Sequence, residues 1–202
     1  MSTLPEQNPT PEHHPGRGQV VVLTAPSGAG KTTIAAALLD EIPGLRFSVS
    51  ATTRPPRPHE QDGVHYHFVS PEHFRACIEG GDLLEYEEVY PGRFYGTLRS
   101  EVERAAETGP VLLDIDVRGA LNVKHLYAGR ALTVFIRPPS LEALEKRLRA
   151  RGTETAETLR VRLETARHEM TFAGAFDVVV VNDELKTAIA ETLQHVRRFL
   201  TG

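Results

Sequence analysis

The chain has 202 residues, enough for one sizeable domain, and its hydrophobic fraction of 40% and charged fraction of 25% are ordinary for a globular protein. Its formal net charge of −4 gives no overall attraction to nucleic acid or to anionic membranes, so binding of phosphate groups must be local. The single cysteine, Cys77, excludes a disulfide framework and a multi-cysteine metal site, and no apolar run approaches the roughly 20 residues of a spanning helix. We therefore expect a cytoplasmic protein with neither nucleic acid nor membrane among its partners.

The N-terminal stretch differs in composition from the rest of the chain. Residues 1–16 hold four of the 14 prolines, two acidic residues and no Lys or Arg. They show no periodic apolar pattern and so offer no face that a folded core would bury. We predict that residues 1–17 form a disordered tail and that one domain spans residues 18–202.

A strand, a loop and a helix are predicted next, with the strand over residues 19–24 and the helix over residues 31–42. The loop matches the phosphate-binding pattern of a glycine, four residues and Gly-Lys-Ser/Thr, except that Ala25 replaces the first glycine. The alternative is a glycine-rich turn with a chance lysine. The strand before the loop and the helix after it favour the phosphate site.

The chemistry of this loop suits a nucleotide. Gly28 and Gly30 let the backbone curl so that several N–H groups converge, and the helix start adds the positive end of its dipole. We expect Lys31 to reach the β- and γ-phosphates and the Thr32 hydroxyl to hold Mg²⁺.

A second phosphate site is indicated by two arginines in a proline-rich stretch. A short strand is predicted over residues 47–51, and three prolines between residues 55 and 58 then hold the backbone extended. Arg54 and Arg57 project from this stretch, and each guanidinium can donate a planar fork of hydrogen bonds to phosphate. Taken alone, the stretch would be read as a solvated surface loop.

Short elements fill the next part of the chain. The patterns predict strands over residues 64–69, 83–89 and 93–96, a helix from the cap Ser70 to about Gly80, and a helix over residues 98–108. An apolar strand then ends in Asp114 and Asp116. Acids at the end of a buried parallel strand lie at the sheet edge where ligands of open α/β sheets bind.

The last third alternates strands and helices. Strands are predicted over residues 131–136 and 177–181, and helices over residues 118–127, 140–150, 157–170 and, capped by Asn182 and Asp183, up to about Leu200. Arg147, Arg151 and Arg162 flank a break at Gly152 and would be able to close over phosphates as a lid. The whole pattern predicts an α/β protein: a parallel sheet with helices on both faces and a mostly antiparallel insert.

Over residues 18–201 the chain resembles the guanylate kinases, which belong to the P-loop nucleoside monophosphate kinases. The motifs that carry the resemblance are Ala25-Pro26-Ser27-Gly28-Ala29-Gly30-Lys31-Thr32, Ser48 to Arg57, Glu60 with Gly63 and Tyr66, Leu84-Glu85-Tyr86, Tyr95-Gly96-Thr97, Leu113-Asp114-Ile115-Asp116, Arg151-Gly152-Thr153-Glu154 and Val181-Asn182-Asp183. The family pattern implies a core (18–46, 98–136 and 171–202), a GMP-binding insert (47–97) and a helical lid (137–170).

The resemblance also implies roles for single residues. ATP would be bound by the loop residues Ala25, Pro26, Ser27, Gly28, Ala29, Gly30, Lys31 and Thr32, with Asn182 near adenine. The GMP phosphate would be held by Arg54, Arg57, Tyr66 and Tyr95, and guanine would be read by Ser50, Glu85, Thr97 and Asp116. Asp114 would lie at the GMP site and bind Mg²⁺ together with Thr32, directly or through water. The charge of the transferred group would be neutralised by Lys31, Arg54, Arg147, Arg151 and Arg162.

The chemistry of guanine supports the role of Glu85. Guanine offers two N–H donors to one carboxylate, which adenine lacks, and a buried site left unpaired by the wrong base rejects that base strongly. Without the resemblance, Glu85 would pass as one of several surface acids near Glu87 and Glu88. Besides Ala25, the chain departs from the family pattern at His59, where glycine often stands.

The resemblance implies ATP-dependent phosphorylation of GMP, and of dGMP, to the diphosphate in purine nucleotide metabolism, with Mg²⁺ as cofactor. Three alternatives stay open at this point. The first is a catalytically inactive, guanylate-kinase-like binding module. The others are a GTPase switch and a kinase for another nucleoside monophosphate.

Overall fold

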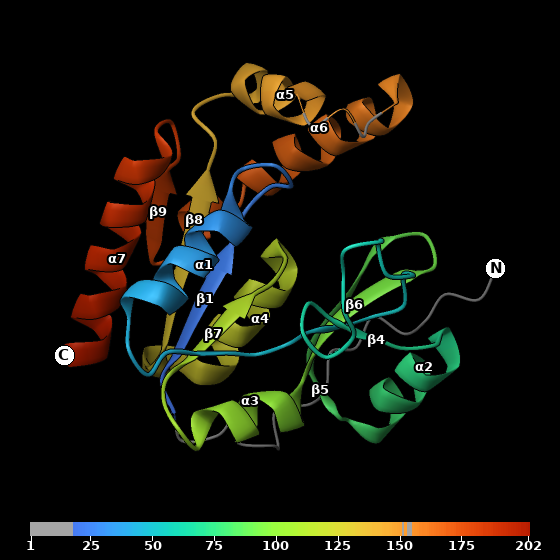
Figure 1. Cartoon of the computed structure of the whole chain (residues 1–202), viewed down its shortest axis with the longest axis vertical. Helices are drawn as coiled ribbons and strands as arrows, with labels where there is room; N and C mark the ends of the chain where they lie inside the picture. The colour runs from blue at the N-terminus through green and yellow to red at the C-terminus, as the bar shows by residue number, and fades with distance from the viewer. Residues whose placement is uncertain (1–17, 151, 153–154) are drawn as a thin grey trace.

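A five-stranded parallel sheet forms the centre of the computed structural model, which describes residues 18–150, 152 and 155–202 (Figure 1). The predicted tail, residues 1–17, and the predicted site residue Arg151 lie outside the described residues. In spatial order the strands are β2 (Arg46–Phe47), β7 (Val111–Asp114), β1 (Val20–Thr24), β8 (Ala131–Arg137) and β9 (Val178–Val181). Val20 of the central strand β1 pairs with Val111 on one side and with Ala131 on the other.

Helices cover both faces of this sheet because both faces of its strands are apolar. Val21 and Leu23 of β1 point to the layer formed by α1 (Lys31–Glu41) and α7 (Leu185–Thr201). Val20 and Val22 point to the opposite layer, formed by α3 (Arg99–Ala106) and α4 (Val117–Tyr127). The short 3₁₀ helices η1 (Ala128–Arg130) and η2 (Ala173–Ala175) precede β8 and β9. The predicted parallel sheet with helices on both faces is thus confirmed.

A second sheet has four strands in the order β4 (His67–Phe68), β3 (Ala51–Thr52), β6 (Arg93–Leu98) and β5 (Leu83–Tyr90). Only the β3–β4 pair is parallel, so the predicted mostly antiparallel character is confirmed. The helix α2 (Pro71–Gly80) packs Phe74 and the buried Cys77 against this sheet. Its predicted cap is present, since the Ser70 hydroxyl accepts a hydrogen bond from the backbone N–H of His73 at 3.1 Å.

Two predicted strands differ from the structure. The stretch 47–51 splits, because Phe47 ends β2 in the parallel sheet and Ala51 begins β3 in the second sheet, with the chain crossing between them. The stretch 64–69 is strand only at His67–Phe68. Residues 63–65 form a turn. Tyr66 makes an isolated β-bridge to Asp62, and its carbonyl accepts a hydrogen bond from the N–H of Gly63 at 2.9 Å. Long-range pairing, which the local pattern does not reveal, sets both outcomes.

A helical pair, α5 (Leu141–Ala150) and α6 (Ala156–Met170), lies above the end of β1 (Figure 1). Leu144 and Leu148 of α5 pack against Leu159 and Ala166 of α6, which gives the pair a small core of its own. The predicted Ser140 cap is confirmed: its hydroxyl accepts from the N–H of Ala143 at 3.1 Å.

The first and last segments of the described domain contact each other at the end of the parallel sheet where β1 begins. The Gln19 side chain, just before β1, donates a hydrogen bond from Nε2 to the carbonyl of Phe199 in α7 at 3.1 Å. Within the described residues, no helix combines the length and the apolar character needed to cross a membrane.

The predicted capping of the last helix by Asn182 and Asp183 is wrong. The Asn182 N–H donates to the carbonyl of Arg137 at 2.8 Å, so this residue still extends the β8–β9 ladder. Glu184 is the N-cap of α7 and makes no side-chain capping bond.

Candidate active site

A cavity of about 320 Å³ lies where the parallel sheet, the second sheet and α6 meet. Most of the predicted site residues line it: Ala25, Pro26, Ser27, Gly28, Gly30, Lys31, Thr32, Ser50, Arg57, Tyr66, Glu85, Tyr95, Asp114, Asp116 and Arg162. Arg54, Thr97, Arg147 and Asn182 are described but are not among its lining residues, and Ala29 is buried in the core beneath the loop. The structure therefore brings together residues from five separate parts of the chain.

The loop between β1 and α1 has the predicted curled backbone. Gly28 and Gly30 have φ values of +95° and +98°, which only glycine adopts readily. Ala25 does not require such an angle, since Ala128 is the one non-glycine residue with positive φ among those described. The departure at Ala25 therefore leaves the phosphate-binding part of the loop unstrained.

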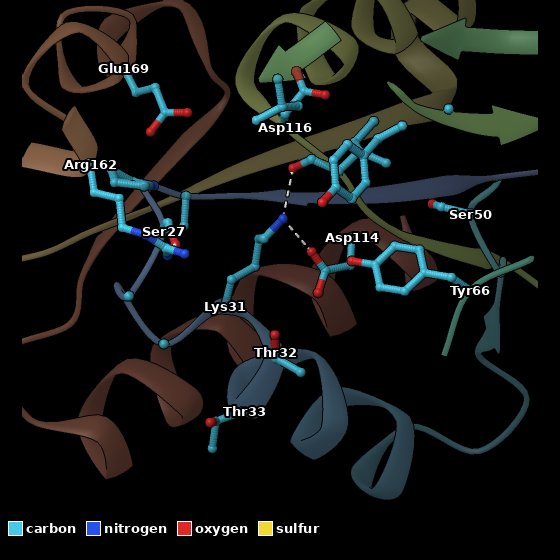
Figure 2. Close-up of a pocket in the computed structure, with 18 of the residues that line it drawn as sticks. Ser27, Lys31, Thr32, Thr33, Ser50, Tyr66, Asp114, Asp116, Arg162 and Glu169 are labelled. Atoms are coloured by element: carbon cyan, nitrogen blue, oxygen red, sulfur yellow. Dashed lines mark hydrogen bonds and ion pairs between the residues drawn. The ribbon is translucent and has the colours of Figure 1, made fainter. Parts of the chain in front are cut away.

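Lys31 projects from the first turn of α1 into the cavity (Figure 2). Its Nζ donates a hydrogen bond to the carbonyl of Ile115 at 2.9 Å and forms an ion pair with Asp114 at the end of β7. Burial lowers the pKa of Lys31, but the charge of Asp114 and the hydrogen bond to it outweigh burial and raise the pKa overall. The ammonium group is thus charged and aimed before a nucleotide is present.

Arg54 occupies a buried ion pair rather than the cavity wall. Its two Nη atoms donate to the two carboxylate oxygens of Glu60 at 2.6 Å each, and its guanidinium lies 5.0 Å from the centre of the Tyr66 ring. The hydrogen bond from Arg54 lowers the pKa of Glu60 to about 2. In this conformation Arg54 supports the wall, while Arg57, Tyr66 and Tyr95 face the cavity.

Glu85 of β5 is a buried carboxyl group that opens onto the cavity. Its Oε1 accepts a hydrogen bond from the hydroxyl of the buried Thr97 at 2.5 Å, and its Oε2 has no partner among the described residues. Burial, and then the charge of Asp116, raise the pKa of Glu85 to about 8. Thr97 contacts Glu85 and is not among the residues that line the cavity.

Asp116 caps the helix α4 and lines the cavity with the rest of its side chain. Its Oδ1 accepts hydrogen bonds from the N–H groups of Arg118 and Gly119 at 2.9 and 3.0 Å. A carboxylate held by backbone donors at a helix N-terminus is fixed in direction.

The helical pair reaches the loop through one of its arginines. Arg162 of α6 donates from Nη1 to the Ser27 hydroxyl at 2.8 Å, so α6 touches the tip of the loop (Figure 2). Arg147 of α5 instead donates to the carbonyls of Asn182 and Asp183 at 2.8 and 3.2 Å, outside the cavity.

Asn182 lies beneath the loop. Its Nδ2 donates to the carbonyl of Ala29 at 2.7 Å, and the side chain is buried. A Cβ atom added at Gly30 would collide with Nδ2, so this contact also requires glycine. In this structure Asn182 contacts the backbone of the loop and is not among the residues that line the cavity.

Glu169, in the last turn of α6, lines the cavity and was missed by sequence reasoning. Burial, and then the charge of Asp116, raise the pKa of Glu169 to about 7. A single acid on a charged helix normally lies on a solvated face, so nothing in the sequence pattern separates Glu169 from its neighbours.

Comparisons with known proteins agree with one another. The family model for guanylate kinase matches residues 17–201. A guanylate kinase from Salinibacter ruber is 63% identical over 183 residues, 91% of this chain and 97% of that protein. One from Bacteroides thetaiotaomicron is 50% identical over 184 residues, 91% of this chain and 90% of that protein.

Solved structures point the same way. The crystal structure of guanylate kinase from Anaplasma phagocytophilum has a TM-score of 0.76 at 31% identity, and the match covers 93% of this chain and 89% of that one. A gluconokinase from Sinorhizobium meliloti, with a TM-score of 0.54 at 21% identity, shares the fold alone and covers 94% of this chain and 96% of that one. Both sequence and fold match over nearly the full length, and the chain therefore belongs to the guanylate kinase family.

Proposed function

We propose that this protein catalyses the ATP-dependent phosphorylation of GMP, and of dGMP, to the diphosphate. The observation that carries the proposal is that Lys31 and Glu85 line the same cavity. One wall is the phosphate-binding loop with Lys31. The opposite wall contains the guanidinium of Arg57 and the buried carboxyl group of Glu85. Two nucleotides bound to these walls would meet with their phosphates between them.

The reaction needs no nucleophile from the protein. An anionic oxygen of the GMP phosphate attacks the γ-phosphorus of ATP, a new O–P bond forms, and the bond from the γ-phosphorus to the bridging oxygen breaks to release ADP. The difficulty is to bring two polyanions together. Lys31, the loop N–H groups and Arg162 supply positive charge from the ATP side, and Arg57 supplies it from the GMP side.

Thr32 and Asp114 fit the proposed Mg²⁺ site by the chemistry of their donors, since a hydroxyl and a carboxylate are hard oxygen ligands. Among the described residues no cluster of three or more His, Cys, Asp or Glu side chains forms a metal site, so phosphate oxygens and water would complete the coordination. When bound, Mg²⁺ neutralises charge on the transferred phosphoryl group. The ion pair with Lys31 orients the carboxylate of Asp114 at the end of β7.

Guanine recognition is assigned to Glu85, with Ser50 and Asp116 beside it. In its ionised form, Glu85 provides acceptors for the two N–H donors of guanine: Oε2, which has no partner among the described residues, and Oε1, which also accepts from the Thr97 hydroxyl. Adenine would leave these acceptors unpaired, and so would be rejected.

Arg54, Arg147 and Asn182 need a rearrangement before they meet a nucleotide. We assign Arg54 to the GMP phosphate only after its ion pair with Glu60 opens, and Arg147 to the transferred group only after its contacts with Asn182 and Asp183 break. In the arrangement described, Arg54 supports the cavity wall, Asn182 holds the backbone of the loop, and Arg147 contacts the backbone after β9 outside the cavity.

A coupled assay with ATP and an acceptor tests the proposal. GMP, dGMP, AMP, UMP and IMP are compared side by side as acceptors, and we expect GMP and dGMP to be strongly preferred. Slow hydrolysis of GTP without an acceptor nucleotide would support a GTPase switch, and nucleotide binding without turnover would support the inactive binding module. The coexistence of Lys31, Thr32 and Asp114 at one cavity favours the active enzyme.

A further inference from the structure

Gly119, in the first turn of α4, lies directly against the side chain of Glu85 in β5. A Cβ atom added at Gly119 would lie 2.8 Å from Cδ of Glu85 and closer still to Oε2. Carbon atoms that are not bonded do not approach so closely. The carboxyl group of Glu85 therefore occupies the space that any side chain at position 119 would need.

The backbone does not explain a glycine here. Gly119 lies within regular helix and is not among the glycines with positive φ, so an L-residue would adopt the same conformation. Alanine is a much better helix former than glycine. The close approach of Glu85 is the feature that requires glycine at this position.

Gly119 also contacts the second carboxylate of the guanine site. Its N–H donates to Oδ1 of Asp116 at 3.0 Å, and Glu85 is held from its other side by the Thr97 hydroxyl at 2.5 Å. One residue thus limits where Glu85 lies and helps to orient Asp116.

We propose that Gly119 is a positioning residue for guanine selection, because its missing side chain fixes the Glu85 carboxyl group at the cavity wall. The inference rests on the proposed function, and within it Gly119 acts through Glu85 rather than on the substrate. Its role predicts a loss of base discrimination rather than a general loss of activity.

The first experiment compares Gly119→Ala with wild type, using GMP and IMP as acceptors. IMP lacks the 2-amino group and so offers Glu85 one N–H fewer. We expect the preference for GMP over IMP, measured as the ratio of kcat/KM values, to fall about tenfold or more, while the KM for ATP stays within about twofold. The matched control is Gly129→Ala, since a Cβ there would meet nothing within 4 Å.

A second experiment asks whether the collision with Glu85 is the cause. Glu85→Asp shortens the side chain by one methylene and makes room for a Cβ at position 119. The double variant Gly119→Ala/Glu85→Asp should therefore recover part of the GMP preference that Gly119→Ala loses. General damage to the fold would not be repaired by this change.

A melting-temperature cycle keeps the inference testable if Gly119→Ala folds poorly. Gly119→Ala should lower the melting temperature in the wild-type background and have no such effect in the Glu85→Ala background, where no carboxyl group is left to collide. Equal losses in both backgrounds, or an unchanged GMP-to-IMP ratio in a folded Gly119→Ala protein, would overturn the inference. Wild-type protein that fails to phosphorylate GMP would refute the proposed function instead, and the melting cycle would still report on the contact.

Discussion

Lys31 is oriented by two groups at the end of the strand β7, the Asp114 carboxylate and the Ile115 carbonyl. The loop pattern in the sequence predicts a lysine that reaches phosphate, because the pattern is local. It does not predict the two partners of that lysine, since they lie more than 80 residues further along the chain and meet it only through the pairing of β1 with β7.

Lys31→Ala should lower kcat about a hundredfold or more, because a charged donor directed at the transferred group is lost. The fold should remain, since the core contacts of α1 come from Ile34 and Leu38. The coupled assay measures kcat, and circular dichroism checks the fold. The exposed Lys186 on α7 provides the control, Lys186→Ala, and near-normal turnover of Lys31→Ala would contradict the assigned role.

The raised pKa of Glu85 predicts a pH dependence of stability. Between the ordinary value of 4.5 and about 8, the unfolded chain has lost the proton while the folded protein keeps it. The stabilising contribution is therefore full below about pH 4.5, decreases as the pH rises towards 8, and is lost above it.

Urea unfolding of wild type and Glu85→Gln over this pH range tests the sign. The difference in free energy of unfolding, wild type minus variant, should fall as the pH rises. A difference that stays flat or increases would show that Glu85 is not protonated in the empty site. The exposed Glu79 on α2 gives the control substitution, Glu79→Gln, which should leave the pH profile unchanged.

At the scale of elements, prediction succeeded where an element buries a long apolar pattern. The observed bounds lie within one or two residues of the predicted ones for the strands β1, β7, β8 and β9 and for the helices α1, α2 and α5. It failed for β2, β3 and β4, which have two residues each and exist only through partners distant in sequence. The contacts of Thr97 with Glu85 and of Asn182 with the carbonyl of Ala29 likewise depend on elements distant in sequence, so the motifs alone do not predict them.

The contact between α6 and the loop yields a prediction of its own. Arg162→Ala should lower kcat about tenfold or more, because it removes a guanidinium that touches the loop at Ser27. Arg160 on the same helix is exposed and pairs with Glu164 at 3.6 Å, so Arg160→Ala is the matched control. The coupled assay at saturating ATP and GMP measures both variants. Equal kcat values for the two variants would contradict a role for Arg162 in transfer.

At the scale of the whole molecule, the site lies between the two sheets. The parallel sheet presents the loop and Asp114, the second sheet presents Glu85 and Tyr95, and α6 adds Arg162. The sequence indicated each group separately, and the resemblance implied that they act together. Their arrangement around one cavity depends on how the chain leaves β2 and returns to β7, which no local pattern encodes.

A single cavity with two nucleotide-binding walls should bind a joined substrate tightly. Adenosine and guanosine linked through five phosphates should bind about a hundredfold or more tightly than ATP or GMP, because the second contact becomes intramolecular. Isothermal titration calorimetry measures the three affinities. Lys31→Ala and Glu85→Gln should each weaken the joined ligand, and an affinity no higher than that of ATP would contradict a shared cavity.

The hydrogen bond from Gln19 to Phe199 ties the entry of the central strand to the last helix, three residues before Gly202. A short glycine linker from residue 202 to residue 18 would therefore join the ends without disturbing the parallel sheet. Reopening such a cyclised chain at the exposed Gly129, between α4 and β8, would give a circular permutant with every wall of the cavity intact. Such a permutant would show that the fold depends on the spatial order of the strands and not on their order along the chain.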